Sequence, residues 1–189
     1  MAVINANSSS SLTVLEDVIK GSHTAVSYLI KCGHIRIGMI AVKDALTTKK
    51  FVDGYQEALR ENAIPIAESF IVYGLGSREA GFCGANTLFM EKCTAIFCMN
   101  DGLAAGVYDF MYQNSIEPGV DISVVGYGDK ELSRYLVPPL TTVRSPLSEM
   151  GRKACQLLVG KPKTQKISEE HFYLPPSLVE RGSVGAPAT

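Results

Sequence analysis

The sequence predicts an α/β protein in which a parallel sheet is flanked by helices. Three continuous apolar runs, at residues 36–42, 94–99 and 122–126, have the composition of strands that are buried on both faces. Amphipathic segments with helical spacing separate these runs, which is the order of strand–helix–strand units. A chain of 189 residues is long enough to bury a core without metal or disulfide staples.

Local signals place the individual elements. A helix that begins near Asp17 is expected to end at Gly33, because glycine readily adopts the left-handed conformation that closes a helix. Ser77 is expected to cap another helix, because its hydroxyl can accept a hydrogen bond from a free backbone N–H. Ser145 and Pro146 mark the start of a further helix. The other expected elements are strands at 70–73, 140–143 and 172–174, helices at 47–62, 77–89, 103–111, 132–136 and 146–158, and a frayed tail at 182–189.

Composition and motifs exclude several classes of protein. The net charge of −1 argues against binding nucleic acid or an anionic membrane by bulk charge, and no apolar run approaches the ~20 residues that span a bilayer. The five cysteines are odd in number and scattered, which favours a reducing cytoplasm. No phosphate loop, dinucleotide fingerprint, nucleophile elbow or metal-ligand spacing occurs, so we expect no enzyme, no cofactor and no metal.

Ligands of parallel sheets bind beyond the carboxyl ends of the strands. In this sequence those ends are residues 42–46, 73–76, 100–101 and 126–129. Asp101 stands at the head of a predicted helix, where it is a candidate nucleophile or metal ligand. The favoured interpretation is an N-cap or first-turn carboxylate that faces the helix dipole.

The sequence resembles the LacI/GalR family of regulators over nearly its whole length. The segments that carry the resemblance are Gly21, Ala25, 28–30 (YLI) and 33–34 (GH), then 54–59 (GYQEAL), 94–106 (TAIFCMNDGLAAG), 121–127 (DISVVGY), 138–143 (PPLTTV), 149–151 (EMG) and 178–183 (LVERGS). Their order is that of the family, which makes chance an improbable explanation.

The resemblance implies a type I periplasmic-binding-protein-like fold with a nearly complete second lobe and a partial first lobe. Residues 1–16 would end the first lobe, 17–143 would form the second lobe, 144–172 would return to the first lobe, and 173–189 would hold the last crossover and the tail. The family's DNA-binding headpiece and most of its first lobe have no counterpart here, so we expect a truncated chain. The implied function is the ligand-sensing and dimerisation core of a regulator, typically a repressor, that acts by effector-driven lobe closure.

Two departures from the family pattern bear on the effector. Phe51 stands where sugar-binding members commonly carry an arginine, three residues before Gly54. Gly128 stands where they commonly carry an aspartate after the glycine–aromatic pair, and Asp129 follows one position later. Arginine and carboxylate groups are natural partners for vicinal hydroxyls or a purine edge. Their loss predicts a more apolar effector than a sugar or nucleobase-like molecule, or none; alternatively, Phe51 merely packs on its helix.

The effector-binding residues that the resemblance and the strand ends imply are Phe51, Asn100, Asp101, Tyr127 and Asp129. Asn100 offers both a donor and an acceptor and is similar to the family's ligand-contacting asparagine. Asp101 is expected to hold the loop by capping its helix. The partners that the resemblance implies are a small-molecule effector of the sugar or nucleobase-like class, a second copy of the chain in a homodimer, and DNA only through a headpiece; no membrane is expected. The alternative function is a solute-binding protein of the same fold. An upstream secretory signal would favour this alternative, whereas an upstream helix-turn-helix would favour the regulator.

Overall fold

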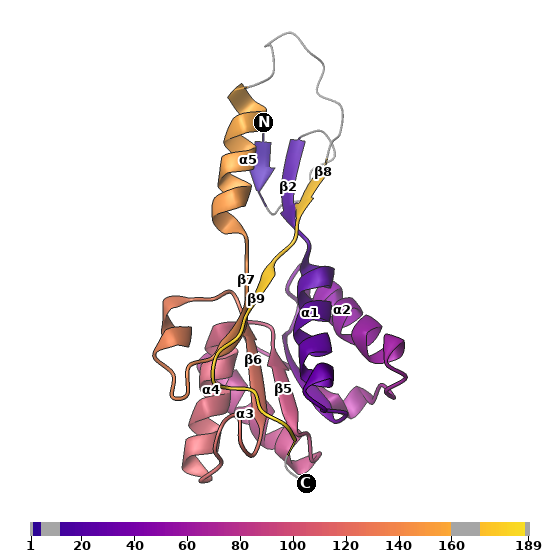
Figure 1. Cartoon of the computed structure of the whole chain (residues 1–189), viewed down its shortest axis with the longest axis vertical. Helices are drawn as coiled ribbons and strands as arrows, with labels where there is room; N and C mark the ends of the chain where they lie inside the picture. The colour runs from indigo at the N-terminus through magenta and orange to yellow at the C-terminus, as the bar shows by residue number, and fades with distance from the viewer. Residues whose placement is uncertain (1, 5–11, 160–170, 188–189) are drawn as a thin grey trace. The chain divides into compact units, whose positions relative to one another are not determined.

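The computed structural model describes residues 2–4, 12–159 and 171–187, and they form two units (Figure 1). Unit 1 comprises residues 1–17 and 145–176, and unit 2 comprises residues 18–144 and 177–189. Parts of the segments expected to belong to a first lobe, 1–16 and 144–172, therefore lie outside the described residues. The chain passes between the two units three times, at residues 17–18, 144–145 and 176–177.

Unit 2 is built on a six-stranded sheet with the order β4-β3-β5-β6-β7-β9. The strands are β3 (Ile37–Val42), β4 (Ile71–Gly74), β5 (Ala95–Cys98), β6 (Ser123–Tyr127), β7 (Thr141–Arg144) and β9 (Ser177–Val179). Neighbouring strands are parallel except β7 and β9, which are antiparallel. The predicted α/β class with a parallel sheet is confirmed, and β9 is a strand that the sequence analysis missed.

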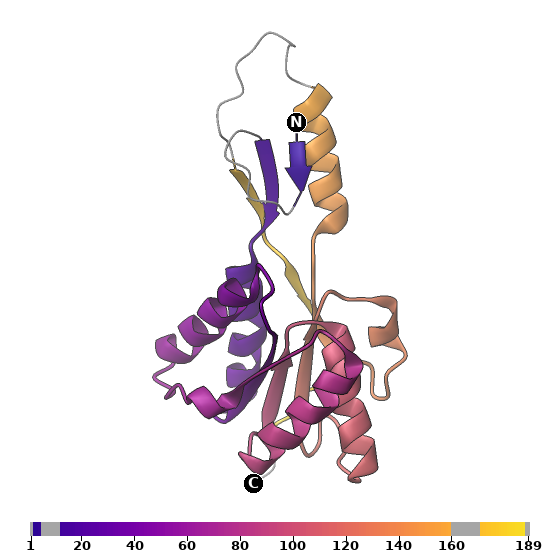
Figure 2. The same ribbon diagram turned by 180° about the vertical axis from the view of Figure 1, so that it is seen from behind.

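Four helices cover this sheet. They are α1 (Val18–Lys31), α2 (Thr48–Glu61), α3 (Arg78–Met90) and α4 (Asp101–Gln113). The pair α1 and α2 lies on one face of the sheet and the pair α3 and α4 on the other, as both ribbon views show (Figures 1 and 2). The core between these layers is one large apolar cluster, whose biggest fully buried side chains include Tyr55, Tyr108 and Phe97.

The helix boundaries follow from capping and close packing. Ser77 caps α3 by accepting from the Ala80 N–H at 3.2 Å, and Gly33 closes α1 with a φ of 102°, as predicted. Helices α3 and α4 approach backbone to backbone at Gly81 and Gly106. A Cβ at Gly81 would lie 2.0 Å from a carbonyl oxygen of α4, so a larger residue there would separate the two helices.

Unit 1 holds a small parallel sheet with the order β1-β2-β8, formed by β1 (Ala2–Ile4), β2 (Leu12–Glu16) and β8 (His171–Leu174). Helix α5 (Leu147–Val159) lies against β1 and β2 (Figure 1). Its Met150 and Ala154 form a small buried cluster with Val14. Leu147 and Val159 of this helix are 61% and 87% exposed.

The short helix expected at 132–136 is a 3-10 helix, η2 (Glu131–Arg134). One local prediction, the frayed tail, is wrong. The described part of the tail, up to residue 187, is held against the sheet. Ser183 is fully buried, its Oγ donates to the Val124 carbonyl at 2.6 Å, and the Thr141 N–H donates to the same Oγ at 2.8 Å. The small residues of this tail had suggested fraying, but their small size is what lets the chain lie close to β6 and β7.

Candidate functional site

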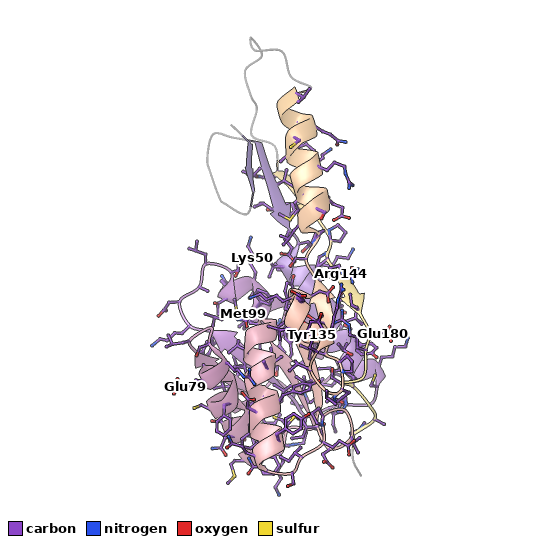
Figure 3. All side chains as sticks on the ribbon, turned by 90° about the vertical axis from the view of Figure 1, so that its left-hand side faces the viewer. Lys50, Glu79, Met99, Tyr135, Arg144 and Glu180 are labelled. Carbon is purple, nitrogen blue, oxygen red and sulfur yellow. The ribbon has the colours of Figure 1, made fainter. Side chains whose placement is uncertain are left out.

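The five predicted effector-binding residues all belong to unit 2 and lie at or near one edge of its sheet. We term this the carboxyl edge: the residues that directly follow β3, β4, β5, β6 and β7, with Phe51 of α2. Asn100 and Asp101 follow β5, Tyr127 ends β6, and Asp129 lies two residues further along. Because parallel strands bring their carboxyl ends to one edge, residues far apart in sequence meet there. Figure 3 labels Lys50, Met99 and Arg144, which come from α2 and from the ends of β5 and β7.

Phe51 and Tyr127 pack against each other. Their ring centroids are 4.7 Å apart with an interplanar angle of 74°, the edge-to-face geometry that aromatic pairs favour. Phe51 also lies 6.3 Å from the ring of Phe97, and both Phe51 and Tyr127 are only 5% exposed. Of the two interpretations of Phe51, the geometry fits packing, since most of its surface is covered within unit 2 itself.

Asn100 is the N-cap of α4. It has extended backbone angles, and its Oδ1 accepts from the Leu103 N–H at 2.8 Å. The capping role that the sequence analysis gave to Asp101 therefore belongs to Asn100. The side chain of Asn100 is half-buried, and its Nδ2 lies 3.6 Å from the position that a Cβ on Gly76 would occupy.

Asp101 is fully buried and holds the edge together from within. Its Oδ1 accepts from the Thr142 hydroxyl on β7 at 2.6 Å, and its Oδ2 accepts from the Lys130 N–H at 2.7 Å. One carboxylate thus joins the start of α4 to β7 and to the loop that follows β6. Asp101 does hold the loop, as expected, although it does so through these bonds and not by capping.

Asp129 is enclosed by two arginines. Arg144 Nε donates to its Oδ2 at 2.7 Å, and Arg181 Nη2 donates to its Oδ1. The carboxylate side chain is 4% exposed, against 51% for Arg144 and 14% for Arg181. Burial alone would raise the pKa of Asp129, but the hydrogen bonds from Arg181 and Arg144 outweigh it and hold the pKa below its ordinary value. Asp129 is therefore an anion that is already paired.

The departure at Gly128 has a backbone cause. Gly128 has a φ of 122°, a conformation that side-chain-bearing residues rarely adopt. A Cβ at this position would also lie 3.5 Å from Asp101 Oδ2, so a carboxylate introduced here would approach another carboxylate. The aspartate of the family pattern cannot be restored by simple substitution, because both the backbone and the local charge oppose it.

Sequence reasoning missed three residues that organise the edge: Thr142, Arg144 and Arg181. Each lies in or beside a segment that carried the family resemblance, yet no role followed from those segments. Arg181 was the signal that could have revealed this cluster. An arginine that is buried beside an apolar strand needs an anion or carbonyl groups as hydrogen-bond acceptors. Its Nη1 donates to the Leu140 carbonyl at 2.7 Å.

Within residues 2–4, 12–159 and 171–187, no group of three or more histidine, cysteine, aspartate or glutamate side chains could hold a metal ion. A search of the same residues finds no helix that is long and apolar enough to cross a membrane.

Comparison with known proteins places this architecture in a family. The model of the periplasmic binding protein-like domain matches residues 26–184. The chain belongs to this family. The ribose operon repressor of Escherichia coli (strain K12) is 32% identical over 173 residues, which are 90% of this chain and 52% of the repressor. The chain thus spans about half the length of the curated relatives it matches.

Solved structures agree with the sequence relatives. A LacI family transcriptional regulator from Enterococcus faecium with bound ribose superposes with a TM-score of 0.88 at 25% identity, covering 100% of this chain and 71% of the regulator. A regulatory protein of the LacI family from Chloroflexus aggregans gives a TM-score of 0.86 at 33% identity, covering 95% and 66%. The resemblance to LacI-family regulators is confirmed, as is the periplasmic-binding-protein-like fold.

Proposed function

We propose that the chain is the effector-sensing and dimerisation part of a LacI-type transcriptional regulator. The observation that carries this proposal is the match of residues 26–184 to the ligand-binding domain family, together with curated relatives that are repressors. The function is binding and not catalysis. These relatives favour a regulator over the alternative, a solute-binding protein for uptake.

Unit 2 serves as the second lobe and unit 1 as part of the first lobe. In such proteins a ligand that binds the closed arrangement better shifts the population toward it, and closure changes how well the dimer binds DNA. Specific DNA contacts belong to a headpiece outside these 189 residues. The net charge of −1 supports this division, because neutralising DNA phosphates requires a basic surface. A regulator of this kind works beside DNA in the cytoplasm, where its unpaired cysteines stay reduced.

The effector occupies the carboxyl edge of unit 2, at Phe51, Asn100, Asp101, Tyr127 and Asp129. The geometry supports different tasks for them. The half-buried Asn100 offers its amide for direct contact, and Phe51 with Tyr127 forms a small aromatic floor. The buried Asp101 and the paired Asp129 fix the start of α4 and the loop that follows β6, next to Asn100 and Tyr127.

The test is transcriptional. The gene that encodes this chain is deleted, and transcripts of the neighbouring genes are compared with those of the parent strain and of a complemented strain. We expect a change of several-fold in a neighbouring operon that complementation reverses. Unchanged transcription, together with a secretory signal upstream of the sequence in the same reading frame, would favour the uptake function instead.

A further inference from the structure

The carboxyl edge has an unusual balance of hydrogen-bonding groups. At the β5–β7 end of the edge lie two carboxylates, and both are engaged: Asp101 by Thr142 and Lys130, and Asp129 by two arginines. Both side chains are at most 4% exposed. Neither is therefore available to accept hydrogen bonds from a ligand's hydroxyl groups. A third carboxylate, Asp44, is exposed in the turn that follows β3.

At the β5–β7 end, the side-chain groups of Asn100 and Arg144 that remain for a ligand are donors. Oδ1 of Asn100 is occupied by the helix cap, and no hydrogen bond between described residues uses its Nδ2. An amide nitrogen carries two N–H donors and no acceptor. The guanidinium of Arg144 carries five N–H donors, Asp129 accepts from its Nε, and the side chain is 51% exposed. Because two arginines face one aspartate, the cluster also carries a net positive charge.

The opposite end of the same edge carries two exposed leucines, beside the exposed Lys43 and Asp44. Leu46 follows β3 and is fully exposed, and Leu75 follows β4 and is 77% exposed. Between them and Asn100, the side chain of Val42 lies 3.5 Å from the position of a Cβ on Gly76. Along the strand order β4-β3-β5-β6-β7, the leucines follow β4 and β3, Asn100 follows β5, and Arg144 ends β7. With about 4.8 Å between neighbouring strands, the distance from β3 to β7 is about 14 Å.

We propose that the effector of this site is an apolar carboxylic acid, bound as its anion. This inference rests on the proposed function, which makes the carboxyl edge the effector site. The carboxylate takes the donors of Asn100 and Arg144, and the apolar body lies toward Leu46 and Leu75. Arginine is the side chain best matched to a planar carboxylate. A polyol suits the β5–β7 end poorly, because each hydroxyl donor left without an acceptor there costs about 1–3 kcal/mol.

The experiment measures binding to the 189-residue chain by ligand-observed and protein-observed NMR titration. The probe is benzoate, and benzamide, ribose and inorganic phosphate are the comparison ligands. Benzamide keeps the ring and removes the charge, phosphate keeps a charge and removes the ring, and ribose is the polyol. We expect benzoate to bind at least tenfold more tightly than each of the three.

Two variants locate the site. Asn100→Asp keeps an equally good helix cap but replaces the amide donors with a carboxylate, so we expect it to weaken benzoate binding at least tenfold without loss of stability. Arg144→Gln should weaken it similarly. The matched control is Arg60→Gln, which removes one positive charge from the exposed face of α2, where Arg60 contacts Gln56. This control should leave benzoate affinity unchanged.

Contrary results separate the two proposals. Benzoate binding that is absent, or that is equal in Asn100→Asp and the parent chain, overturns the carboxylic acid. Tighter binding of phosphate than of benzoate overturns the apolar body. Ribose binding that Asn100→Asp abolishes overturns the ligand class but supports an effector site at this edge. The transcription experiment tests the regulator function independently of all these outcomes.

Discussion

Replacing Asp101 tests whether this buried carboxylate holds the carboxyl edge together. The substitution Asp101→Ala leaves the Thr142 hydroxyl and the Lys130 N–H without their acceptor inside the protein. Hydrogen bonds to a charged group each contribute about 1.5–3 kcal/mol, so the two together predict a loss of about 3–6 kcal/mol in the free energy of unfolding. That is a large part of the ~5–15 kcal/mol that stabilises a typical domain.

The assay is urea denaturation followed by far-ultraviolet circular dichroism, with Asn100→Ser as the matched control. Serine caps a helix about as well as asparagine, so the control should lose less than about 0.5 kcal/mol. A double-mutant cycle with Thr142→Val isolates the 2.6 Å bond and should give a coupling of about 1–2 kcal/mol. A loss below about 1 kcal/mol in Asp101→Ala, or no coupling to Thr142, would refute the structural role of this carboxylate.

Three further predictions concern titration and assembly. Burial lowers the pKa of His34 below 6.5, so the stability that the neutral imidazole contributes is complete above that pH and is lost as the pH falls. The free energy of unfolding should therefore decrease from pH 7 to 5 more steeply in the parent chain than in His34→Gln. The pKa of Asp129 is also lowered, so its contribution is present above about pH 3.9 and lost below, and Asp129→Asn should flatten the acid end of the same curve. Light scattering should show a dimer, and a monomeric parent chain at high concentration would contradict it. Met90→Lys, on the exposed end of α3, should weaken this dimer. The control Leu46→Lys places the same charge at the carboxyl edge and should leave the dimer unchanged.

The parallel sheet and its helices could be predicted because their signals are local and repeated. Buried strands such as β3 and β5 are continuous apolar runs, and Ser77 and Gly33 mark helix ends through chemistry that needs no tertiary partner. Strand β9 could not be predicted in this way, because it has only three residues, follows two prolines and is stabilised by pairing with β7. The buried tail at Ser183 likewise depends on partners more than 40 residues away in sequence.

For the candidate site, the sequence predicted that its residues lie at or near one edge of the sheet, but it did not predict their hydrogen-bonding roles. Asn100 and Asp101 are neighbours in sequence, and either residue type can cap a helix. Only the positions of Thr142 and Lys130 decide that Asp101 turns inward and leaves the cap to Asn100. The pairing of Asp129 was equally hidden, because its arginine partners come from segments 15 and 52 residues away.

The pairing of Asp129 also links ligand binding to the places where the chain leaves unit 2. Arg144 is the last residue of unit 2 before the chain passes into unit 1, and β9, which the returning chain forms, leads directly to Arg181. Both arginines converge on Asp129, beside the strand that ends at Tyr127. Under the proposed binding mode, a carboxylate ligand would take the N–H groups of Arg144 that Asp129 does not use, next to the point where the chain leaves unit 2.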